Sequence, residues 1–234
     1  MLTAAIDVGT TPEVAVADPG TRLAEYRRAL AFYLALPGLD GLLFCENTGH
    51  DLAALQALDP AGRVEFLRIS DPARDLGRGK GHAELGIVLE ALATSRTIRA
   101  EDLVVKVTGR YLVRNLPRLA ASLRANPGYD VVGDLRRTLT RVDTRVCAFR
   151  PAFAATYLAP QRARIDDRRG VFLEHAFARA TLLALADGGR WRPWAVEPDI
   201  EGVSGTGGDG YQRGPLRRAY RATLRRLQWA TLQR

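Results

Sequence analysis

Four short polar segments of this 234-residue chain carry the side chains best suited to chemistry. Each one follows an apolar run typical of a strand or opens an apolar pattern typical of a helix. They are Glu46 to Asp51 (ENTGHD), Gly77 to Glu84 (GRGKGHAE), Thr108 to Tyr111 (TGRY) and Phe172 to His175 (FLEH). A glycine-rich turn with lysine and arginine at a helix start is an ordinary means of holding phosphate oxygens. The second segment therefore predicts a site for a diphosphate.

The third segment ends the stretch LVVKVTGRYLVRN, an apolar strand pattern with basic residues in and after it. Lys80 and Lys106 are the only lysines in the chain, and all its other cations are arginines. Because an ammonium and a guanidinium are not interchangeable, both lysines are candidates for a specific role. Two alternatives stay open: Lys106 points to solvent from a half-exposed strand, and Arg110 pairs structurally with Asp130 or Asp134.

The elements around these segments alternate in the first half of the chain. Apolar spacing predicts helices at 22–36, 51–58, 82–95 and 115–126, and strands within 41–49, 64–70 and 102–109. This order predicts an α/β fold with a mostly parallel sheet flanked by helices. Ligands of such sheets sit at the carboxyl ends of the strands, so the first three polar segments are expected along one edge.

The regular alternation ends near residue 129. Strands are predicted within 129–135 and 144–153, followed by an Arg/Asp-rich loop and a helix over 171–186. A glycine-rich loop over 202–211 and a basic amphipathic helix from 215 complete the chain. That helix either presents a solvated basic face or attaches to an anionic membrane surface, and both stay open.

Composition limits the function classes. The net charge of +8 favours anionic partners. Arginines are scattered and aromatic residues are few, which speaks against a nucleic-acid-binding surface. No apolar run reaches the roughly 20 residues that span a bilayer, and the first residues lack a signal-peptide pattern. A cytoplasmic protein is therefore expected. It would be peripheral at the inner membrane face if the last helix binds lipid. Cys45 and Cys147 are expected to be buried free thiols, and the three histidines show no metal-ligand spacing.

In order and spacing, the polar segments resemble the GT-A family of nucleotide-sugar glycosyltransferases. LLFCENTGHDLAAL resembles the acidic-Asn-Gly-Ser-x-Asp turn after the family's second strand. RISDPARDLGRGKGHAELGIVLEAL is similar to its glycine-rich segment and following helix, and VFLEHAFARA to the helix start that carries its general base. The resemblance covers about residues 40–185.

The resemblance implies a Rossmann-like GT-A domain with a nucleotide-sugar-binding half (1–128), a smaller acceptor-side half (129–214) and a C-terminal helix (215–234). The implied activity is transfer of a sugar from a nucleotide-sugar to a glycan or lipid-linked acceptor in surface polysaccharide synthesis, with inversion. The site residues it implies are Glu174 as base with His175 as second choice, Glu46 and Asn47 at the nucleoside, Arg78 and Lys80 at the phosphates, Lys106, Arg110 and Tyr111 at the end of the fourth strand, and Asp134 on the acceptor side.

One motif of the family is missing. Where its Asp-x-Asp metal site is expected, this chain has Thr108-Gly109-Arg110-Tyr111. No Mg or Mn site is therefore expected there, and we hypothesise metal-independent transfer in which Arg110, Lys106 or Lys80 supplies the positive charge. For Glu174, a purely structural role in the first turn of a helix stays open.

Two other function classes were weighed. DPGTRLAEY is similar to a loop of sugar nucleotidylyltransferases, but it lacks one glycine and the following Pro-Lys pair, so nucleotidyl transfer is the alternative enzyme activity. Non-enzymatic nucleic-acid binding is the second alternative.

Overall fold

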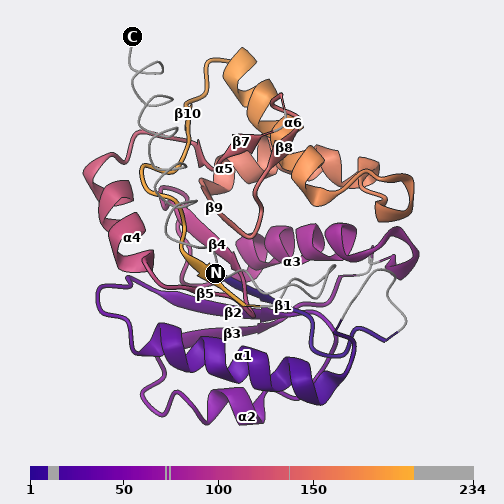
Figure 1. Cartoon of the computed structure of the whole chain (residues 1–234), viewed down its shortest axis with the longest axis vertical. Coiled ribbons are helices and arrows are strands. Elements are labelled where there is room, and N and C mark those ends of the chain that lie inside the picture. The colour runs from indigo at the N-terminus through magenta and orange to yellow at the C-terminus, as the bar shows by residue number, and fades with distance from the viewer. Residues whose placement is uncertain (10–15, 72, 74, 137, 203–234) are drawn as a thin grey trace, which may run out of the picture.

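The computed structural model describes residues 1–9, 16–71, 73, 75–136 and 138–202. Its centre is a seven-stranded sheet in the order β10-β6-β9-β4-β1-β2-β3 (Figure 1). The strands are β1 (Leu2–Ala4), β2 (Leu42–Glu46), β3 (Val64–Arg68), β4 (Val104–Thr108), β6 (Val131–Val132), β9 (Val146–Phe149) and β10 (Trp191–Arg192). β1 to β4 run parallel, as do β6 and β10, whereas β9 is antiparallel to both of its neighbours. The predicted Rossmann-like α/β class with a mostly parallel sheet is confirmed.

Helices cover both faces of this sheet. They are α1 (Pro19–Leu34), α2 (Ala53–Gln56), α3 (Lys80–Thr94), α4 (Leu116–Ala125), α5 (Pro151–Phe153) and α6 (Leu173–Ala186). Short 3-10 or π turns lie at Leu76–Arg78, Ala154–Leu158, Ala159–Arg164 and Asp167–Arg169. Since successive strand residues point to opposite faces, Leu43 and Cys45 of β2 pack with α3 and α6, while Leu42 and Phe44 pack with α1 and α4.

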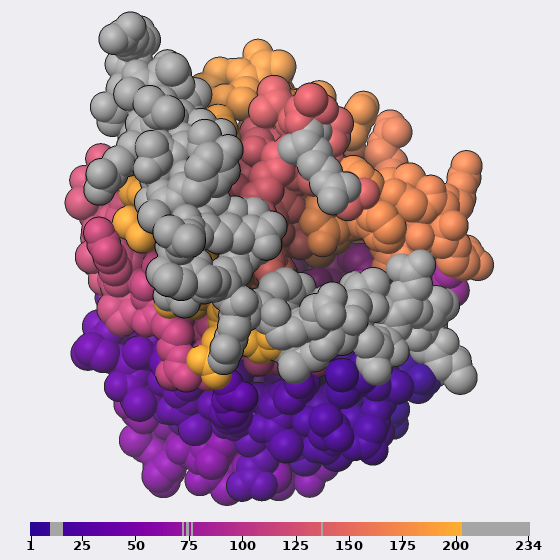
Figure 2. Space-filling model, in the orientation of Figure 1, coloured from indigo at the N-terminus to yellow at the C-terminus, as the bar shows by residue number. Residues whose placement is uncertain are grey.

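Two small ribbons lie beside the sheet. β5 (Leu112–Val113) pairs with β11 (Ile200–Glu201), and β7 (Leu135–Arg136) pairs with β8 (Arg141–Val142). Through β11, the last described residues return to the first half of the chain, where Glu201 forms ion pairs with Arg28 and Arg114. In the face shown in Figure 2, the early part of the chain, indigo to purple, fills the lower half, and later pink and orange residues fill the upper half.

Most predicted elements are present with shifted ends. The main difference is β1, which sequence periodicity does not predict because it has only three residues, yet it lies between β2 and β4 in the sheet. The predicted glycine-rich loop beyond Gly202 and the C-terminal helix fall outside the described residues.

Candidate functional site at the carboxyl edge of the sheet

The carboxyl ends of β1, β2, β3 and β4 lie along one edge of the sheet. The register pairs Ala4 with Glu46, and Thr3 with Thr108. The first and third polar segments of the sequence therefore begin at strand ends on either side of β1. The second reaches the same edge through α3, whose Glu84 accepts hydrogen bonds from the hydroxyls of Thr3 (2.8 Å) and Thr108 (3.2 Å).

Glu46 and Asn47 are both buried at this edge. The side chain of Glu46 has no exposed surface, and its carboxylate accepts hydrogen bonds from the backbone N–H groups of Ile6 at 3.1 Å and Gly49 at 3.0 Å. It also accepts one from the backbone N–H of Thr48 at 2.9 Å. Glu46 thus ties the loop after β1 to the loop after β2. A nucleotide at this edge would meet the loops that Glu46 shapes.

Asp7 is an exposed carboxylate at the end of β1 that the sequence analysis missed. Its backbone N–H donates to the hydroxyl of Thr48 at 3.1 Å, and its side chain accepts from the N–H of Gly9 at 3.1 Å. Because β1 was not predicted, no pattern marked Asp7 as a residue at a strand end.

The glycine-rich start of α3 holds a carboxylate from elsewhere in the chain. Asp167, which is 4% exposed, accepts a hydrogen bond from the N–H of Gly81 at 3.1 Å. A Cβ atom on Gly79 would lie only 2.4 Å from the Asp167 Oδ2 atom, and Gly79 has a φ of 91°. The glycines therefore make room for Asp167, whose negative charge is favourable at the helix N-terminus. The sequence analysis expected a phosphate at this place.

The two cations of this segment differ in their surroundings. The guanidinium of Arg78 donates to the carbonyl of Ile165 at 2.9 Å and to that of Ala163. Arg78 thereby fixes the loop that carries Asp167. Lys80 is the first residue of α3 and stays partly exposed.

Lys106 is fully buried and ion-paired with Glu84, with 2.5 Å between Nζ and Oε1. Its ammonium also donates to the carbonyl of Thr144 at 2.7 Å and to the hydroxyl of Thr108 at 3.1 Å. Burial alone would raise the pKa of Glu84, but the charge and hydrogen bond of Lys106 outweigh it and hold this pKa below its ordinary value. The Glu84 side chain keeps 23% of its surface exposed. Lys106 does not point to solvent, and its charge is balanced inside the protein.

Arg110 is also paired, with Glu25 of α1. The Arg110 Nη1 atom lies 2.5 Å from the Glu25 carboxylate, and Arg110 is 8% exposed. Burial opposes the charge of Arg110, but the bond to Glu25 prevails and the pKa of Arg110 is raised. Its ion-pair partner is neither Asp130 nor Asp134, the two that the sequence analysis considered. Tyr111 is buried, at 4% exposure.

Glu174 lies in the first turn of α6 and is partly exposed. Burial raises the pKa of its carboxyl group, and the negative charges of Glu84 and Asp143 raise it further, while Lys106 acts in the opposite direction. The start of α6 packs against the start of α3, since the Leu173 backbone N lies 3.1 Å from the position that a Cβ atom on Gly81 would take. A carboxylate with a raised pKa is suited to accept a proton.

His175 contributes to the start of α6. Its Nδ1 atom lies 3.0 Å from the backbone N of Phe172, and its Nε2 atom lies 2.9 Å from the Arg141 Nε atom. A neutral imidazole has only one acceptor nitrogen, so only one of these contacts can be a hydrogen bond in that form. The ring also stacks on Phe172, with 5.7 Å between centroids. These contacts fix the helix end that carries Glu174.

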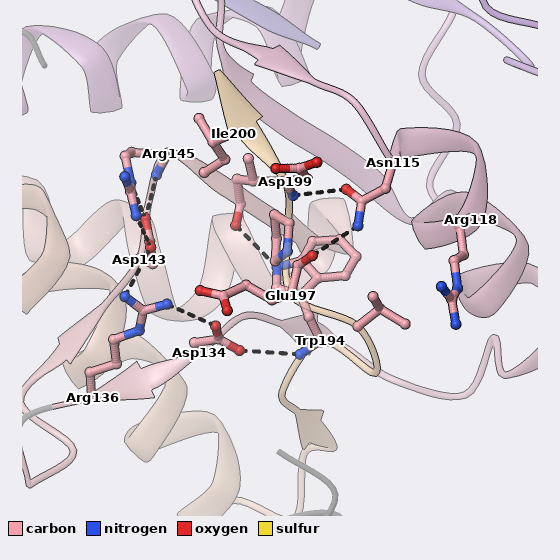
Figure 3. Close-up of a pocket in the computed structure, with 13 residues that line it drawn as sticks. Asn115, Arg118, Asp134, Arg136, Asp143, Arg145, Trp194, Glu197, Asp199 and Ile200 are labelled. Atoms are coloured by element: carbon pink, nitrogen blue, oxygen red, sulfur yellow. Dashed lines mark hydrogen bonds and ion pairs between the residues drawn. The ribbon is translucent and has the colours of Figure 1, made fainter. Parts of the chain in front are cut away.

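A cavity of about 330 Å³ adjoins this edge, between the start of α4, the start of β9 and residues 194–200 (Figure 3). One wall is a chain of ion pairs in which Arg136 contacts Asp134 at 3.1 Å and Asp143 at 3.3 Å. Arg145 in turn binds Asp143 with two contacts, at 2.6 and 2.8 Å. We call this chain of ion pairs, Asp134–Arg136–Asp143–Arg145, the ion-pair ladder. Asp134, which the sequence predicts on the acceptor side, is one end of it.

Among the described residues, no group of three or more His, Cys, Asp or Glu side chains is arranged to hold a metal ion. Over the same residues, no helix is long and apolar enough to cross a membrane. Cys45 and Cys147 are buried free thiols, as predicted.

Several partners in the site were not identified from the sequence. They are Asp7, Glu25, Glu84, Asp143, Arg145 and Asp167. The signal that could have found Glu84 is Lys106 itself, because a lysine within an apolar strand needs a buried anion, and Glu84 ends the predicted polar segment. Asp167 lies in the Arg/Asp-rich loop, but no local pattern connects that loop to α3.

Comparison with known proteins gives limited information. No protein-family model matches the chain, and no curated protein matches it. Among solved structures, the chain is similar to a cytidylyltransferase from Leptospira borgpetersenii serovar Hardjo-bovis (strain JB197), with a TM-score of 0.46 and 13% sequence identity. The superposition covers 85% of this chain and 76% of that one. A likeness this distant does not extend to the residues of a site.

Proposed function

We propose that the protein is a nucleotide-sugar enzyme of GT-A type that transfers a sugar from an activated nucleotide donor to an acceptor hydroxyl of a glycan or lipid-linked glycan. The observation that carries the proposal is the position of Glu174. Its pKa is raised, and it lies in the first turn of α6, which packs against the start of α3, the helix that brings Glu84 to the carboxyl ends of the parallel strands. Ligands of open α/β sheets bind at these strand ends, so a proton acceptor there is placed for chemistry on such a ligand.

In this proposal the acceptor hydroxyl gives its proton to the Glu174 carboxylate as its oxygen attacks the anomeric carbon of the donor. The bond from that carbon to the diphosphate breaks, and the diphosphate leaves with the electron pair. Direct attack of this kind inverts the anomeric carbon. His175 supports the reaction indirectly, since its contacts with Phe172 and Arg141 fix the helix start.

The leaving diphosphate needs positive charge near it. Lys106 and Arg110 are buried and paired with Glu84 and Glu25, and Arg78 is bonded to backbone carbonyls. Our candidate for contact with the phosphates is Lys80, because it is partly exposed and is the first residue of α3, whose N-terminus favours anions. Because Thr108-Gly109-Arg110-Tyr111 stands where the GT-A family has its Asp-x-Asp motif, we propose that transfer does not require a divalent ion.

A second candidate is nucleotidyl transfer to a sugar phosphate. The segment DPGTRLAEY follows β1 and opens α1, the position that the similar loop of nucleotidylyltransferases takes, and Asp18 caps that helix through the N–H of Thr21. However, the Arg22 guanidinium donates to the carbonyls of Ala5 (2.7 Å) and Val16 (3.0 Å). Because Arg22 is 5% exposed, a triphosphate would have to displace these bonds to reach it.

The two candidates differ in the product released. We would first screen nucleotides and nucleotide-sugars for thermal stabilisation, and then measure nucleoside diphosphate release from the stabilising donor. Glu174→Gln should lower that release by about 100-fold to 10,000-fold, the usual contribution of a general base. Glu101→Gln, at an exposed position, is the matched control. Pyrophosphate release from a nucleoside triphosphate and a sugar 1-phosphate would support nucleotidyl transfer.

The same assay tests the protonation state and the metal. Because the pKa of Glu174 is raised, the acid limb of the wild-type pH profile should lie above the ordinary glutamate pKa of about 4.3 and should be absent from Glu174→Gln. Excess chelator should leave the rate unchanged. Metal independence would be refuted if chelator abolished turnover and added manganese restored it. The proposed function would be refuted if no nucleotide or nucleotide-sugar stabilised the protein.

A further inference from the structure

The cavity beside the ion-pair ladder has the properties of a ligand site. Its volume of about 330 Å³ lies at the lower end of the range for small-molecule pockets, roughly 300–1,000 Å³. The ladder supplies a polar wall, while Val146, Val196 and Ile200 supply apolar lining (Figure 3). A ligand that fits must be small and must itself have polar and apolar faces.

Asp143, at the middle of the polar wall, is held ionised by its two arginine neighbours. Burial opposes ionisation of Asp143, but hydrogen bonds from Arg145 and the charge of Arg136 prevail and hold the pKa of Asp143 below its ordinary value. Asp134 is held at its other oxygen by the backbone N–H of Trp194, at 3.4 Å. Hydrogen bonds and ion pairs therefore hold the donors and acceptors along this wall.

The lining of the cavity has one more carboxylate than guanidinium groups. Its lining contains four carboxylates, from Asp134, Asp143, Glu197 and Asp199, and three guanidinium groups. Two of those guanidinium groups, Arg136 and Arg145, are bound to ladder carboxylates, and Arg118 lies on the opposite side (Figure 3). A phosphate or carboxylate entering here would add negative charge to a lining that already has more carboxylates than guanidinium groups. The lining thus differs in sign from the chain as a whole, whose net charge is +8.

Hydroxyl groups suit such a wall. A guanidinium offers five N–H donors and a carboxylate has about four acceptor positions, so pairing leaves some of each unused. A hydroxyl donates and accepts at once, and it can bridge a neighbouring carboxylate and guanidinium without adding charge. A sugar ring combines several hydroxyls with an apolar C–H face, which matches the apolar lining.

The cavity also adjoins the carboxyl end of β4. Arg145 lines the cavity, and its carbonyl accepts a hydrogen bond from the backbone N–H of Thr108, the last residue of β4, at 3.0 Å. The residue before it, Thr144, accepts the hydrogen bond from Lys106 at 2.7 Å. A ligand in the cavity therefore lies at the strand end where Lys106 pairs with Glu84.

We propose that this cavity is the acceptor subsite and that the part of the acceptor it holds is an uncharged sugar ring, selected against anionic sugars by the excess of carboxylates in its lining, to which Asp134 contributes. This inference rests on the proposed function and narrows its acceptor to a neutral glycosyl unit.

Saturation-transfer NMR with simple probes tests the inference. The probes are methyl glycosides of glucose, galactose and mannose, compared with the corresponding methyl uronates and 6-phosphates. At least one neutral glycoside should bind, and its charged counterparts should bind at least tenfold more weakly. Asp134→Asn keeps an oxygen for the Trp194 N–H but removes one negative charge, so it should reduce this discrimination by about threefold or more.

Asp40→Asn is the matched control, because Asp40 forms only an exposed ion pair with Arg124. It should leave the discrimination unchanged. Binding of uronates or phosphates equal to that of the neutral glycosides, unchanged selectivity in Asp134→Asn, or no binding of any glycoside would each overturn the inference. Thermal stabilisation by nucleotides, measured on the same samples, reports separately on the proposed function.

Discussion

The buried pair between Glu84 and Lys106 gives the sharpest test of how the carboxyl edge is built. Lys106 has no exposed surface, and its ammonium is bound by the Glu84 carboxylate, the Thr144 carbonyl and the Thr108 hydroxyl. Replacement by methionine keeps the chain length and apolar contacts of the stem but removes the charge. Glu84 would then remain as a largely buried anion without its cation.

Removing one partner of a buried ion pair usually costs 3–5 kcal/mol. Glu84 keeps 23% exposure and two threonine hydroxyls, so we expect Lys106→Met to cost about 3 kcal/mol, at the low end of that range. For a chain of this size, each kcal/mol shifts Tm by about 2–4 °C, which gives a loss of roughly 6–12 °C. The double variant Glu84→Gln/Lys106→Met should regain more than half of the lost free energy, because it leaves no uncompensated charge.

The pH dependence has a definite sign. In the wild type, the pKa of Glu84 is lowered in the folded state, so the pair stabilises the protein above the ordinary glutamate pKa of about 4.3, and this contribution is lost as the pH falls through the folded-state value. In Lys106→Met, burial without the cation should instead raise the pKa of Glu84. The free energy of unfolding that the variant loses relative to the wild type should therefore be largest at pH 7. This loss should become smaller as the pH falls below the raised folded-state pKa of Glu84 in the variant.

Urea unfolding followed by circular dichroism at pH 7 and pH 4.5 measures these differences. Lys80→Met is the matched control, since it removes the chain's other lysine from a partly exposed position, and it should change stability by less than about 1 kcal/mol. The reasoning would be refuted if Lys106→Met were as stable as the control, or if the double variant were no more stable than Lys106→Met.

Two further predictions concern residues outside the ion pair. Gly79→Ala should destabilise the protein by about 1–3 kcal/mol in urea unfolding, because its φ is 91° and its Cβ would lie 2.4 Å from the Asp167 carboxylate; unchanged stability would show that Asp167 does not cap α3 in solution. Burial raises the pKa of Cys45 and of Cys147 to about 12, so neither thiol should react with iodoacetamide at pH 8 in the native protein, whereas both should react in urea. Rapid native labelling of either would contradict the buried positions.

The elements of the fold that could be predicted are those with strong local periodicity. The buried faces of α1, α3 and α6 repeat every three or four residues, so their apolar spacing is visible in the sequence. β1 has three residues and no alternation, and only its pairing with β2 and β4 defines it. Strand order beyond β4 depends on pairing in the same way, since β9 enters the sheet antiparallel between β4 and β6.

The location of the candidate site could be predicted from the sequence, but the contacts between its residues could not. Polar residues after strands mark the carboxyl edge, because parallel strands end together there. The sequence does not reveal the partner of each charged group, because the partners are far apart in the chain. Arg110 and Glu25 are 85 residues apart, and Gly81 and Asp167 are 86 apart. Their pairing depends on how helices pack on the sheet, and no local pattern in one sequence encodes it.

These contacts within the protein decide which charged residues at the carboxyl edge can bind a ligand. Lys106, Arg110 and Arg78 all look like phosphate ligands in the sequence, but each is bound to other residues of the chain. A ligand could recruit them only by displacing those bonds, and for Lys106 and Arg110 this would leave buried groups unpaired. Substitutions at these three positions should therefore act mainly on stability. Substitutions at partly exposed Lys80 and Glu174 should act mainly on binding and turnover, and residue type alone does not give this division.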